Sequence, residues 1–230
     1  MSCNPAAANR RIKSYVLRQG RITPAQKKAL TEYLQRYAIR AGASPLDLNE
    51  IFGRSAPRVL EIGAGSGEFT LCEAALHPEN DYLAAEVHAP GIGRLLQGIA
   101  AGGLTNIRVI DQDVVVALQG LIPEDALDQA MIFFPDPWPK QRHHKRRLIN
   151  REFLDLLVTR MRAHGRLYLA TDWQELAEEI RTLGDAHPRL WNLAGPGYFA
   201  PRPAWRPETR FERRGKRLGH EVYDLVYCLR

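Results

Sequence analysis

The chain has 230 residues, of which 45% are hydrophobic and 25% charged, so it is long enough for one main core and has the composition of an ordinary globular protein. No apolar run approaches the roughly 18 residues that cross a bilayer, and the N-terminus lacks the apolar core of a signal peptide. These features exclude a disordered or membrane-spanning protein, and we expect a cytoplasmic one.

The positive charge is concentrated in three segments. Residues 1–42 have a net charge of +8, and residues 140–147 and 202–217 have +5 each, so the rest of the chain carries −12 although the total is +6. Each segment taken alone is compatible with a solvated surface. The three together indicate basic surfaces that face a polyanion.

The three cysteines, Cys3, Cys72 and Cys228, are far apart, with no CxxC spacing and no histidine cluster beside them. This pattern excludes a disulfide framework and a zinc site, and we expect no metal. We expect Cys72, in an apolar helical pattern, and Cys228, in a strand-like run, to be buried, because a free cysteine behaves as a small hydrophobic residue.

The N-terminal segment is predicted to be a basic arm outside the core. Residues 1–10 have the composition of a loose tail, and residues 10–37 are basic and partly helical, with Thr23-Pro24 as a cap-like start. We therefore divide the chain into an arm, residues 1–42, and a single domain, residues 43–230.

From residue 58 onward, short apolar runs alternate with helix-length segments, which is typical of a parallel α/β sheet. The predicted strands are residues 58–62, 82–87, 107–110, 130–134, 166–170 and 222–229. The predicted helices are residues 68–76, 93–102, 114–121, 148–163 and 173–184. Residues 195–219, rich in Pro, Gly and Arg, are predicted to be a long connection, and connections of that length are usually functional or mobile.

The first predicted strand runs into three alternate glycines, Gly63, Gly65 and Gly67, and then into a helix. Glycines at this place let the backbone turn tightly and approach a ligand at the carboxyl edge of the sheet. The pattern predicts a nucleotide-cofactor site. Because nicotinamide enzymes use a related loop, the glycines alone do not identify the cofactor.

Three acids near the glycine loop favour S-adenosylmethionine. Glu61 precedes the loop, where the cationic amino-acid end of that cofactor would lie, and Glu86 ends the second strand, where its carboxylate can accept both ribose hydroxyls. Asp113 follows the third strand and suits an adenine amino group. For Asp111 and Asp113, a turn with a helix N-cap remains an alternative.

A rigid, acid-containing loop is predicted after the fourth strand, in residues 135–147. Its three prolines exclude a helix or a central strand, so Asp136 and Trp138 should be held at the carboxyl edge of the sheet beside the cofactor. The alternative is a proline-stiffened surface turn followed by a basic helix face.

Two acid pairs further along the chain also fit helix caps. Asp172 with Glu175 matches an N-cap with its partner three residues on, and Thr209 with Glu212 matches the capping-box spacing. We expect the first pair to form a cap and still face the cleft. The second pair is followed by a basic run, so we favour a substrate-binding loop there.

Four segments together resemble the bacterial tRNA (guanine-N7)-methyltransferases. They are EVHAPGIG (residues 86–93), FPDPWPKQRHHKRR (residues 134–147), TDW (residues 171–173) and TRFE (residues 209–212), and the resemblance extends from residues 10–14 to residues 214–220. A chance match to all four segments is not credible.

The resemblance implies a Rossmann-like class I methyltransferase fold of the α/β class: a seven-stranded, mostly parallel sheet with its last strand reversed and helices on both faces. It also implies the activity, which is S-adenosylmethionine-dependent methylation of N7 of guanine in tRNA, at guanosine 46 of the variable loop. Transfer RNA is then the partner, and no obligate protein partner is inferred.

The resemblance further implies the site residues. Those that contact the cofactor are Glu61, Glu86, Asp113 and Asp136, to which the loop reasoning adds Gly63 and Gly65, and Asp136 is the family's catalytic acid. Those that contact the substrate are Lys140, Asp172, Thr209, Arg210, Phe211 and Glu212, with Arg142, His143, His144, Lys145, Arg146 and Arg147 along the RNA. The chain departs from the family at Arg210, where Lys is common, and at Val114, where Ala is frequent, but charge and burial are preserved.

The expected chemistry agrees with these residues, because guanine N7 has a lone pair and no proton, so the transfer needs alignment and no strong base. Three alternatives remain open at this point. Asp136-Pro137-Trp138 is similar to the D/N-P-P-Y/W loop of enzymes that methylate exocyclic amines, but it has one proline after the acid instead of two. The others are a noncatalytic RNA-binding protein and a nicotinamide oxidoreductase.

Overall fold

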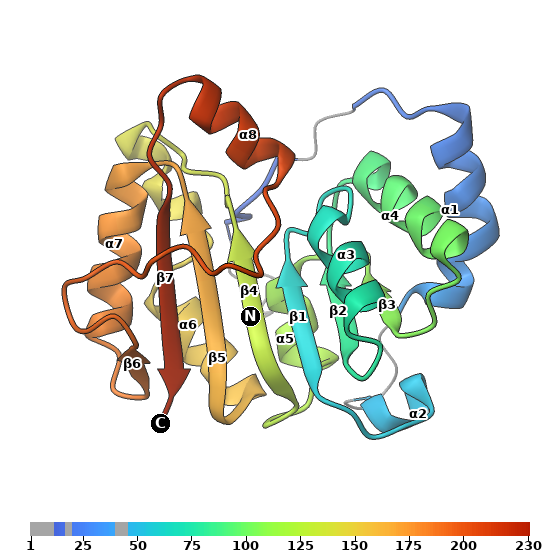
Figure 1. Ribbon diagram of the computed structural model, residues 1–230, viewed down its shortest axis with the longest axis horizontal. Helices are drawn as coiled ribbons and strands as arrows, with labels where there is room; N and C mark the ends of the chain where they lie inside the picture. Colours follow the sequence, from blue (N-terminus) through green and yellow to red (C-terminus); the bar gives the residue numbers. More distant parts are fainter. Residues whose placement is uncertain (1–11, 17–19, 40–45) are drawn as a thin grey trace, which may run out of the picture.

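The computed structural model describes residues 12–16, 20–39 and 46–230. Within these residues, seven strands form one sheet in the order β3-β2-β1-β4-β5-β7-β6. They are β1 (Arg58–Ile62), β2 (Asp81–Ala85), β3 (Ile107–Ile110), β4 (Leu127–Phe133), β5 (Met161–Thr171), β6 (Leu190–Asn192) and β7 (Tyr223–Leu229). Only β7 runs against its neighbours β5 and β6, so the expected sheet of mostly parallel strands with the last one reversed is confirmed (Figure 1).

Helices cover both faces of the sheet, because alternate strand residues are buried on opposite sides. One core cluster joins the strands to α2 (Leu48–Phe52), α5 (Val114–Gly120), α6 (Arg151–Arg160) and α7 (Gln174–Asp185). The other joins them to α1 (Pro24–Tyr37), α3 (Glu68–Leu76) and α4 (Ala89–Gly102). A 3-10 helix, η1 (Gln141–Arg146), and a basic helix, α8 (Arg210–Arg217), lie near the carboxyl ends of the parallel strands.

The five predicted helices and six predicted strands are confirmed, with ends that differ by a few residues. The short strand β6 and helix α2 give too few residues for a periodic pattern to be recognised. Helix α8 was expected to be part of a long connection, and that interpretation is wrong for its eight residues. Its sequence, RFERRGKR, lacks the apolar stripe from which a helix is usually predicted.

Helix α1 belongs to the core, which corrects the expectation of an arm lying outside it. Thr23 and Gln26 form a capping box at its start, and Ala29 and Tyr37 are buried against α4 and β3. The backbone N–H of Ile39 donates to the carbonyl of Val109 at 2.8 Å. The division of the chain at residue 42 stays a prediction, because residues 1–11, 17–19 and 40–45 lie outside the described part.

The segment between β6 and α8 takes the place of a helix over part of the sheet. It crosses one face of β7, β5 and β4 before it rises to α8 (Figure 1). The Trp205 ring packs edge-on against Tyr168 at 4.9 Å and lies 6.0 Å from the ring of Phe69, between ring centroids. Aromatic packing therefore fixes the segment that leads into α8.

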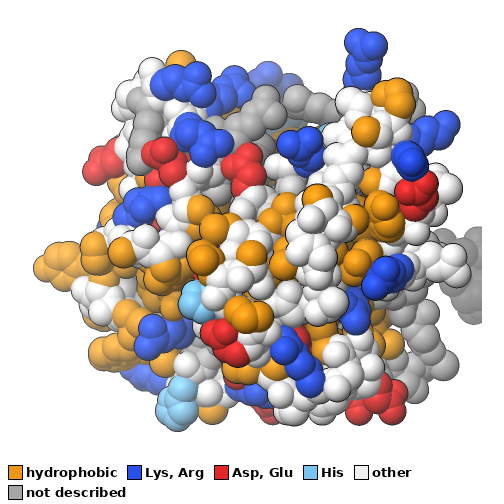
Figure 2. Space-filling view, turned by 45° about the vertical axis from the view of Figure 1, so that its right-hand side comes forward, with side chains coloured by type: hydrophobic (Ala, Val, Ile, Leu, Met, Phe, Trp, Pro, Cys, Tyr) orange, Lys and Arg blue, Asp and Glu red, His pale blue; other side chains and the backbone are white. Residues whose placement is uncertain are grey.

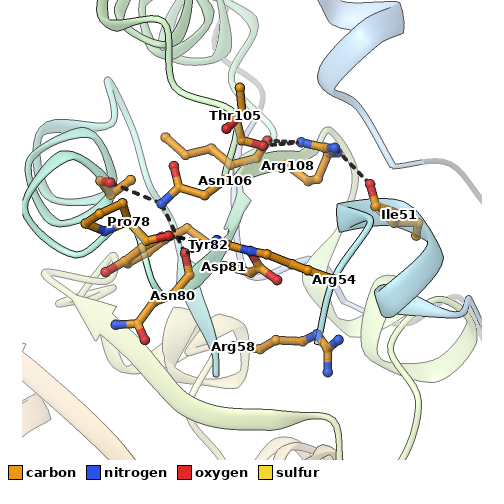
Figure 3. Close-up of polar contacts among 12 residues, drawn as sticks. Ile51, Arg54, Arg58, Pro78, Asn80, Asp81, Tyr82, Thr105, Asn106 and Arg108 are labelled. Atoms are coloured by element: carbon orange, nitrogen blue, oxygen red, sulfur yellow. Dashed lines mark hydrogen bonds and ion pairs between the residues drawn. The ribbon is translucent and has the colours of Figure 1, made fainter. Parts of the chain in front are cut away.

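A polar cluster holds α2 at the opposite edge of the sheet, where the parallel strands begin (Figure 3). Arg54 donates to the buried carboxylate of Asp81 at 2.8 Å and to two backbone carbonyls. Arg108 donates to the carbonyl of Ile51 at 2.8 Å, and Asn106 donates to the carbonyls of Ala74 in α3 and of Asn80. These bonds are internal, so the cluster is a structural support for this edge.

The expected burial of two cysteines is wrong. Cys72 is exposed, because α3 buries its opposite side through Phe69, Thr70 and Ala74. Cys228 is half-buried, because its neighbour across the sheet is the short strand β6. Cys3 lies outside the described residues. None of the described helices combines the length and apolarity needed to span a bilayer.

Candidate active site

A cleft of about 1630 Å³ opens at the carboxyl ends of β1, β2 and β4. Four of the acids singled out from the sequence line it: Glu61, Glu86, Asp113 and Asp136. Its other side is lined by residues from α8, the loop after β4 and the described segment at residues 12–16. Lys and Arg side chains gather along the same edge of the molecule, at the top of Figure 2.

The glycine loop has the backbone shape that the sequence predicts. Gly63, Gly65 and Gly67 have φ of 80°, 56° and 79°, the left-handed region that only glycine adopts readily. At Gly67 a Cβ atom would also lie 2.4 Å from the Leu95 side chain, so a larger residue is excluded twice over. Gly63 and Gly65 line the cleft.

Backbone donors hold the Glu86 carboxylate in place. One oxygen accepts from the N–H of Gly65 at 2.7 Å, and the other accepts from Val87 at 2.7 Å and His88 at 2.8 Å. The side chain therefore ties the end of β2 to the glycine loop. Because it is bound from three directions, its position within the cleft is fixed before any ligand arrives.

Glu61 is buried beneath the glycine loop, where its side chain is 6% exposed. The Thr70 hydroxyl donates to its carboxylate. Burial raises the pKa of Glu61 to about 8, because desolvation outweighs the Thr70 bonds and the Glu86 charge raises it further. A cation bound beside this carboxyl would lower its pKa and favour the charged form, so the position suits a positively charged group.

Asp113 caps α5 by accepting from the N–H of Val115 at 3.0 Å, so the cap interpretation is confirmed, and the residue also lines the cleft. Beside it, Gln112 lines the cleft with a buried Nε2 that has no hydrogen-bond partner among the described residues. Sequence reasoning missed Gln112, because an amide between two acids gives no signal of its own.

The loop after β4 has the rigid, irregular path that its prolines predict. Phe134 and Trp138 have φ of 53° and 47°, and the Phe134 N–H donates to the Ala170 carbonyl at 2.7 Å. The Trp138 indole N–H donates to the Ser14 carbonyl at 3.0 Å. Asp136, at the centre of the loop, is exposed and faces the cleft. The exclusion of a helix is correct for residues 135–139 and wrong for the 3-10 helix η1 that follows.

The basic segment divides into an exposed group and one buried arginine. Lys140, Arg142 and Lys145 are exposed, and Arg146 lies over the Trp138 ring, 5.2 Å from its centroid. His143 packs against the same ring at 5.8 Å. Trp138 lines the cleft and these side chains do not, so they lie beside the cleft as its basic rim.

Arg147 was expected to lie along the RNA, but it is 3% exposed. It donates to the Pro137 carbonyl at 3.0 Å and pairs with Glu175 and Glu179 of α7. His144 also lies 3.4 Å from Glu175. Arg147 therefore attaches the acid-containing loop to α7, and its expected contact with RNA stays a prediction.

The cap expected from Asp172 and Glu175 does not form. The N-cap of α7 is Trp173, which makes no side-chain cap because an indole has no acceptor, and Glu175 is engaged by Arg147. Asp172 faces α8 instead: its carboxylate lies 3.2 Å from the His220 ring, and a Cβ at Gly215 would lie 2.7 Å from it.

The cap that was less favoured, at Thr209, does form. The Thr209 hydroxyl accepts from the N–H of Glu212 at 3.2 Å, so this segment is a helix start and not a loop. Glu212 is fully buried against Arg202 and Arg206, and its expected contact with substrate stays a prediction. The side chains of Arg210 and Phe211, also expected to contact substrate, lie outside the described part of the structure.

The structure adds two arginines that were not singled out from the sequence. Arg214 and Arg217 of α8 are exposed and line the cleft together with Thr209. Their only sequence signal is the net charge of residues 202–217, which does not tell which arginines face the cleft. In this segment Arg206 is buried and Arg214 exposed, although both are the same residue type.

Comparison with known proteins places these features in context. The family described as "Putative methyltransferase" matches residues 55–225. A tRNA (guanine-N(7)-)-methyltransferase of Nitrosospira multiformis is 53% identical over 95% of this chain and 95% of its own length. One of the same name from Nitrosomonas eutropha is 51% identical over 94% and 96%. The crystal structure of the aminoglycoside resistance methyltransferase NpmB1 has a similar fold, with a TM-score of 0.54, 17% identity and coverage of 80% of this chain and 92% of that one.

Proposed function

The chain belongs to the bacterial tRNA (guanine-N7)-methyltransferase family, and we propose that it methylates N7 of guanine 46 in the variable loop of tRNA, with S-adenosylmethionine as methyl donor. The observation that supports this most is that Glu61, Glu86, Asp113 and Asp136 line one cleft whose rim is basic. The acids suit the methyl donor, and the basic rim suits RNA phosphates.

The residues present fit S-adenosylmethionine, which when bound supplies an electrophilic methyl group on a cationic sulfur. Glu61 is a buried acid, with its pKa raised by desolvation, that a cationic group beside it would hold in the charged form, and Glu86 is a fixed acceptor for hydroxyl groups. The orphaned amide of Gln112 offers a donor to a polar ring atom next to Asp113. We propose that these four residues hold the cofactor.

On the substrate side, the chain has to orient guanine and stabilise positive charge. N7 attacks through its own lone pair, so no residue has to remove a proton from it. The product purine is cationic, and Asp136 is the acid on the rigid loop at the cleft, so we propose that its carboxylate stabilises this charge and accepts from the guanine N–H groups.

Contacts to the RNA are proposed for the exposed and half-buried basic residues of the rim and of α8. They are Lys140, Arg142, His143, His144, Lys145, Arg146, Arg214 and Arg217. For Asp172 and Thr209 we propose that they face the substrate while they also stabilise α8. A cytoplasmic location and activity without an obligate protein partner stay predictions.

The test is to incubate the protein with labelled S-adenosylmethionine and unmodified tRNA, digest the RNA, and map the labelled nucleoside. We expect 7-methylguanosine at position 46. A matched transcript with adenosine at that position should not be labelled. A different methylnucleoside would support the exocyclic-amine alternative and contradict the proposal. Titration calorimetry with S-adenosylmethionine and with a nicotinamide dinucleotide separates the enzyme from the noncatalytic and oxidoreductase alternatives.

A further inference from the structure

Arg206 is the largest side chain that is fully buried, and it is placed between two acids. Its guanidinium donates to Glu212 at 2.6 Å and to Asp224 at 3.1 Å. Arg202 adds a second ion pair to Glu212 at 3.0 Å. We call Arg202, Arg206, Glu212 and Asp224 the buried ion cluster. It joins the start of α8 to β7.

The same arginine touches the strand that leads into the acid-containing loop. Its guanidinium carbon lies 5.6 Å from the centroid of the Phe133 ring and 5.8 Å from that of Phe134. Phe134 is two residues before Asp136, and its backbone is held by Ala170, which is the register partner of Asp224 across β5 and β7. One buried cation is therefore in contact with both the loop and α8.

The exposed side of α8 then faces the cleft. Glu212 sits in the first turn and fixes how the helix is rotated, so Arg214 and Arg217 are presented to the cleft. Further along, a Cβ at Gly215 would lie 2.7 Å from the Asp172 carboxylate, so a side chain there would displace that carboxylate. The rotation of α8 is thus set by a buried ion pair, and its height above the sheet by the close approach of Gly215 to Asp172.

Stability alone does not account for such a cluster. A buried ion pair costs much desolvation, and apolar residues of similar volume are often equally stable in its place. Burial alone would raise the pKa of Glu212, yet Arg206 and Arg202 hold it below its ordinary value, so this carboxylate stays charged. What ion pairs add over apolar packing is a defined direction, because the guanidinium binds carboxylates in a fixed geometry.

We propose that Arg206 is a positioning residue for methyl transfer. It fixes α8, with Arg214 and Arg217, relative to the loop that contains Asp136, so that bound RNA is placed correctly with respect to the Asp136 carboxylate. The proposal rests on the proposed function for its kinetic part only. Binding of tRNA to α8 can be measured without methyl transfer.

The test uses Arg206→Met together with the variant Arg206→Met/Glu212→Gln/Asp224→Asn, in which no carboxylate is left buried and unpaired. We expect the second variant to fold and to bind S-adenosylmethionine within about twofold of the parent, because none of its changes touches Glu61, Glu86 or Gln112. We expect the single-turnover rate at saturating tRNA to fall by about tenfold or more, since a small misplacement of the reacting groups is costly. The slope of log tRNA affinity against log salt should become shallower by about 1 to 2, for the contacts of Arg214 and Arg217.

Arg206→Lys keeps the charge but cannot bind both carboxylates in the fixed geometry of a guanidinium. We therefore expect its folding stability to be closer to the parent's value than its single-turnover rate. Arg54→Met is the matched control, since it breaks the Arg54–Asp81 ion pair at the far edge of the sheet. It should lower stability without changing the salt slope or the single-turnover rate.

Three results would overturn the proposal. The first is a folded variant with the parent's rate and salt slope. The second is an equal loss of cofactor affinity, which would indicate general damage to the sheet. The third is unfolding of every cluster variant, Arg206→Lys included, which would make the cluster structural only. If the parent makes no 7-methylguanosine, the proposed function fails, while the salt slopes still decide whether Arg206 positions α8.

Discussion

The two walls of the cleft are built in different ways. Along β1 and β2, the wall is made of backbone: glycines with positive φ and N–H groups that hold Glu86. Along the loop after β4 and α8, it is made of side chains, and the two segments are held by ion pairs of the buried arginines Arg147 and Arg206 with Glu175 and Glu212. The first wall has its shape from local geometry. The second depends on charges, some of them from other parts of the chain, so it should respond to changes in charge and salt.

The largest effect is expected from Asp136→Asn, at the point where the two walls meet. The prolines at 135, 137 and 139 keep the loop's path, so the change should remove charge and leave folding and most tRNA binding intact. Loss of one preorganised electrostatic partner costs about 10²–10³ in rate. Single-turnover rates at saturating tRNA and cofactor would measure this step without binding.

Asp136→Glu is the matched control for that variant, since it keeps the charge and moves it by one methylene. We expect a smaller loss than for the amide. A rate for Asp136→Asn within threefold of the parent would show that Asp136 is structural and that the charge of the product is stabilised by another group.

The backbone wall is tested by Glu86→Ala. We expect a loss of about ten- to a hundredfold in S-adenosylmethionine affinity, because hydrogen bonds to a charged acceptor are worth about 1.5–3 kcal/mol. The three N–H groups that the carboxylate now binds would also lose their partner. Affinity for tRNA and its salt slope should stay near the parent's values. Unchanged cofactor affinity, measured by calorimetry on a folded variant, would contradict the assignment.

The difference between the two walls also explains which parts of the fold and of the site could be predicted from the sequence. The pattern of Gly63, Gly65 and Gly67 predicts a positive φ, because few other residues tolerate that conformation. The acids around these glycines follow the ends of the strands at regular positions. The sheet, the parallel direction of its strands and the wall along β1 and β2 were therefore predictable from short-range pattern and spacing.

The second wall was less predictable, because the residue type of a lysine or arginine does not show whether it binds phosphate or a buried carboxylate. Arg147 and Glu212 were expected to contact RNA or substrate and are buried, Arg147 against Glu175 of α7 and Glu212 against Arg206. Asp172 was expected to cap α7 and instead meets His220. Such pairings depend on tertiary packing, which a single sequence does not contain.

The rim of the second wall is tested by Arg142→Gln/Lys145→Gln/Arg146→Gln. We expect tRNA affinity to fall and the slope of log affinity against log salt to become shallower by about 2 to 3, one contact for each lost charge. Cofactor affinity should be unchanged. Arg142→Gln/Lys145→Gln is the control for packing, because only Arg146 also lies over the Trp138 ring. An unaltered salt slope in the triple variant would show that this segment is merely solvated.

The smallest effect is expected from the pH dependence of cofactor binding, through Glu61 in the backbone wall. With its pKa raised to about 8 by burial, Glu61 is mostly protonated at pH 7 in the free protein. A carboxyl with a raised pKa stabilises the fold most at low pH, and this contribution is lost as the pH rises through 8. A cationic ligand beside Glu61 favours its ionised form over its protonated form, so binding should release a proton.

Linkage then sets the size of that effect: affinity should rise by about fivefold between pH 7 and pH 8, if the bound carboxylate stays ionised. Calorimetry in two buffers of different ionisation enthalpy measures the released proton directly. Glu61→Gln removes this titration and leaves that of the cofactor's own amine, so the difference between the two proteins isolates Glu61. Equal proton release in both would mean that Glu61 does not change its protonation state on binding. This result would contradict the pairing of Glu61 with the cationic group of the cofactor as the source of the released proton.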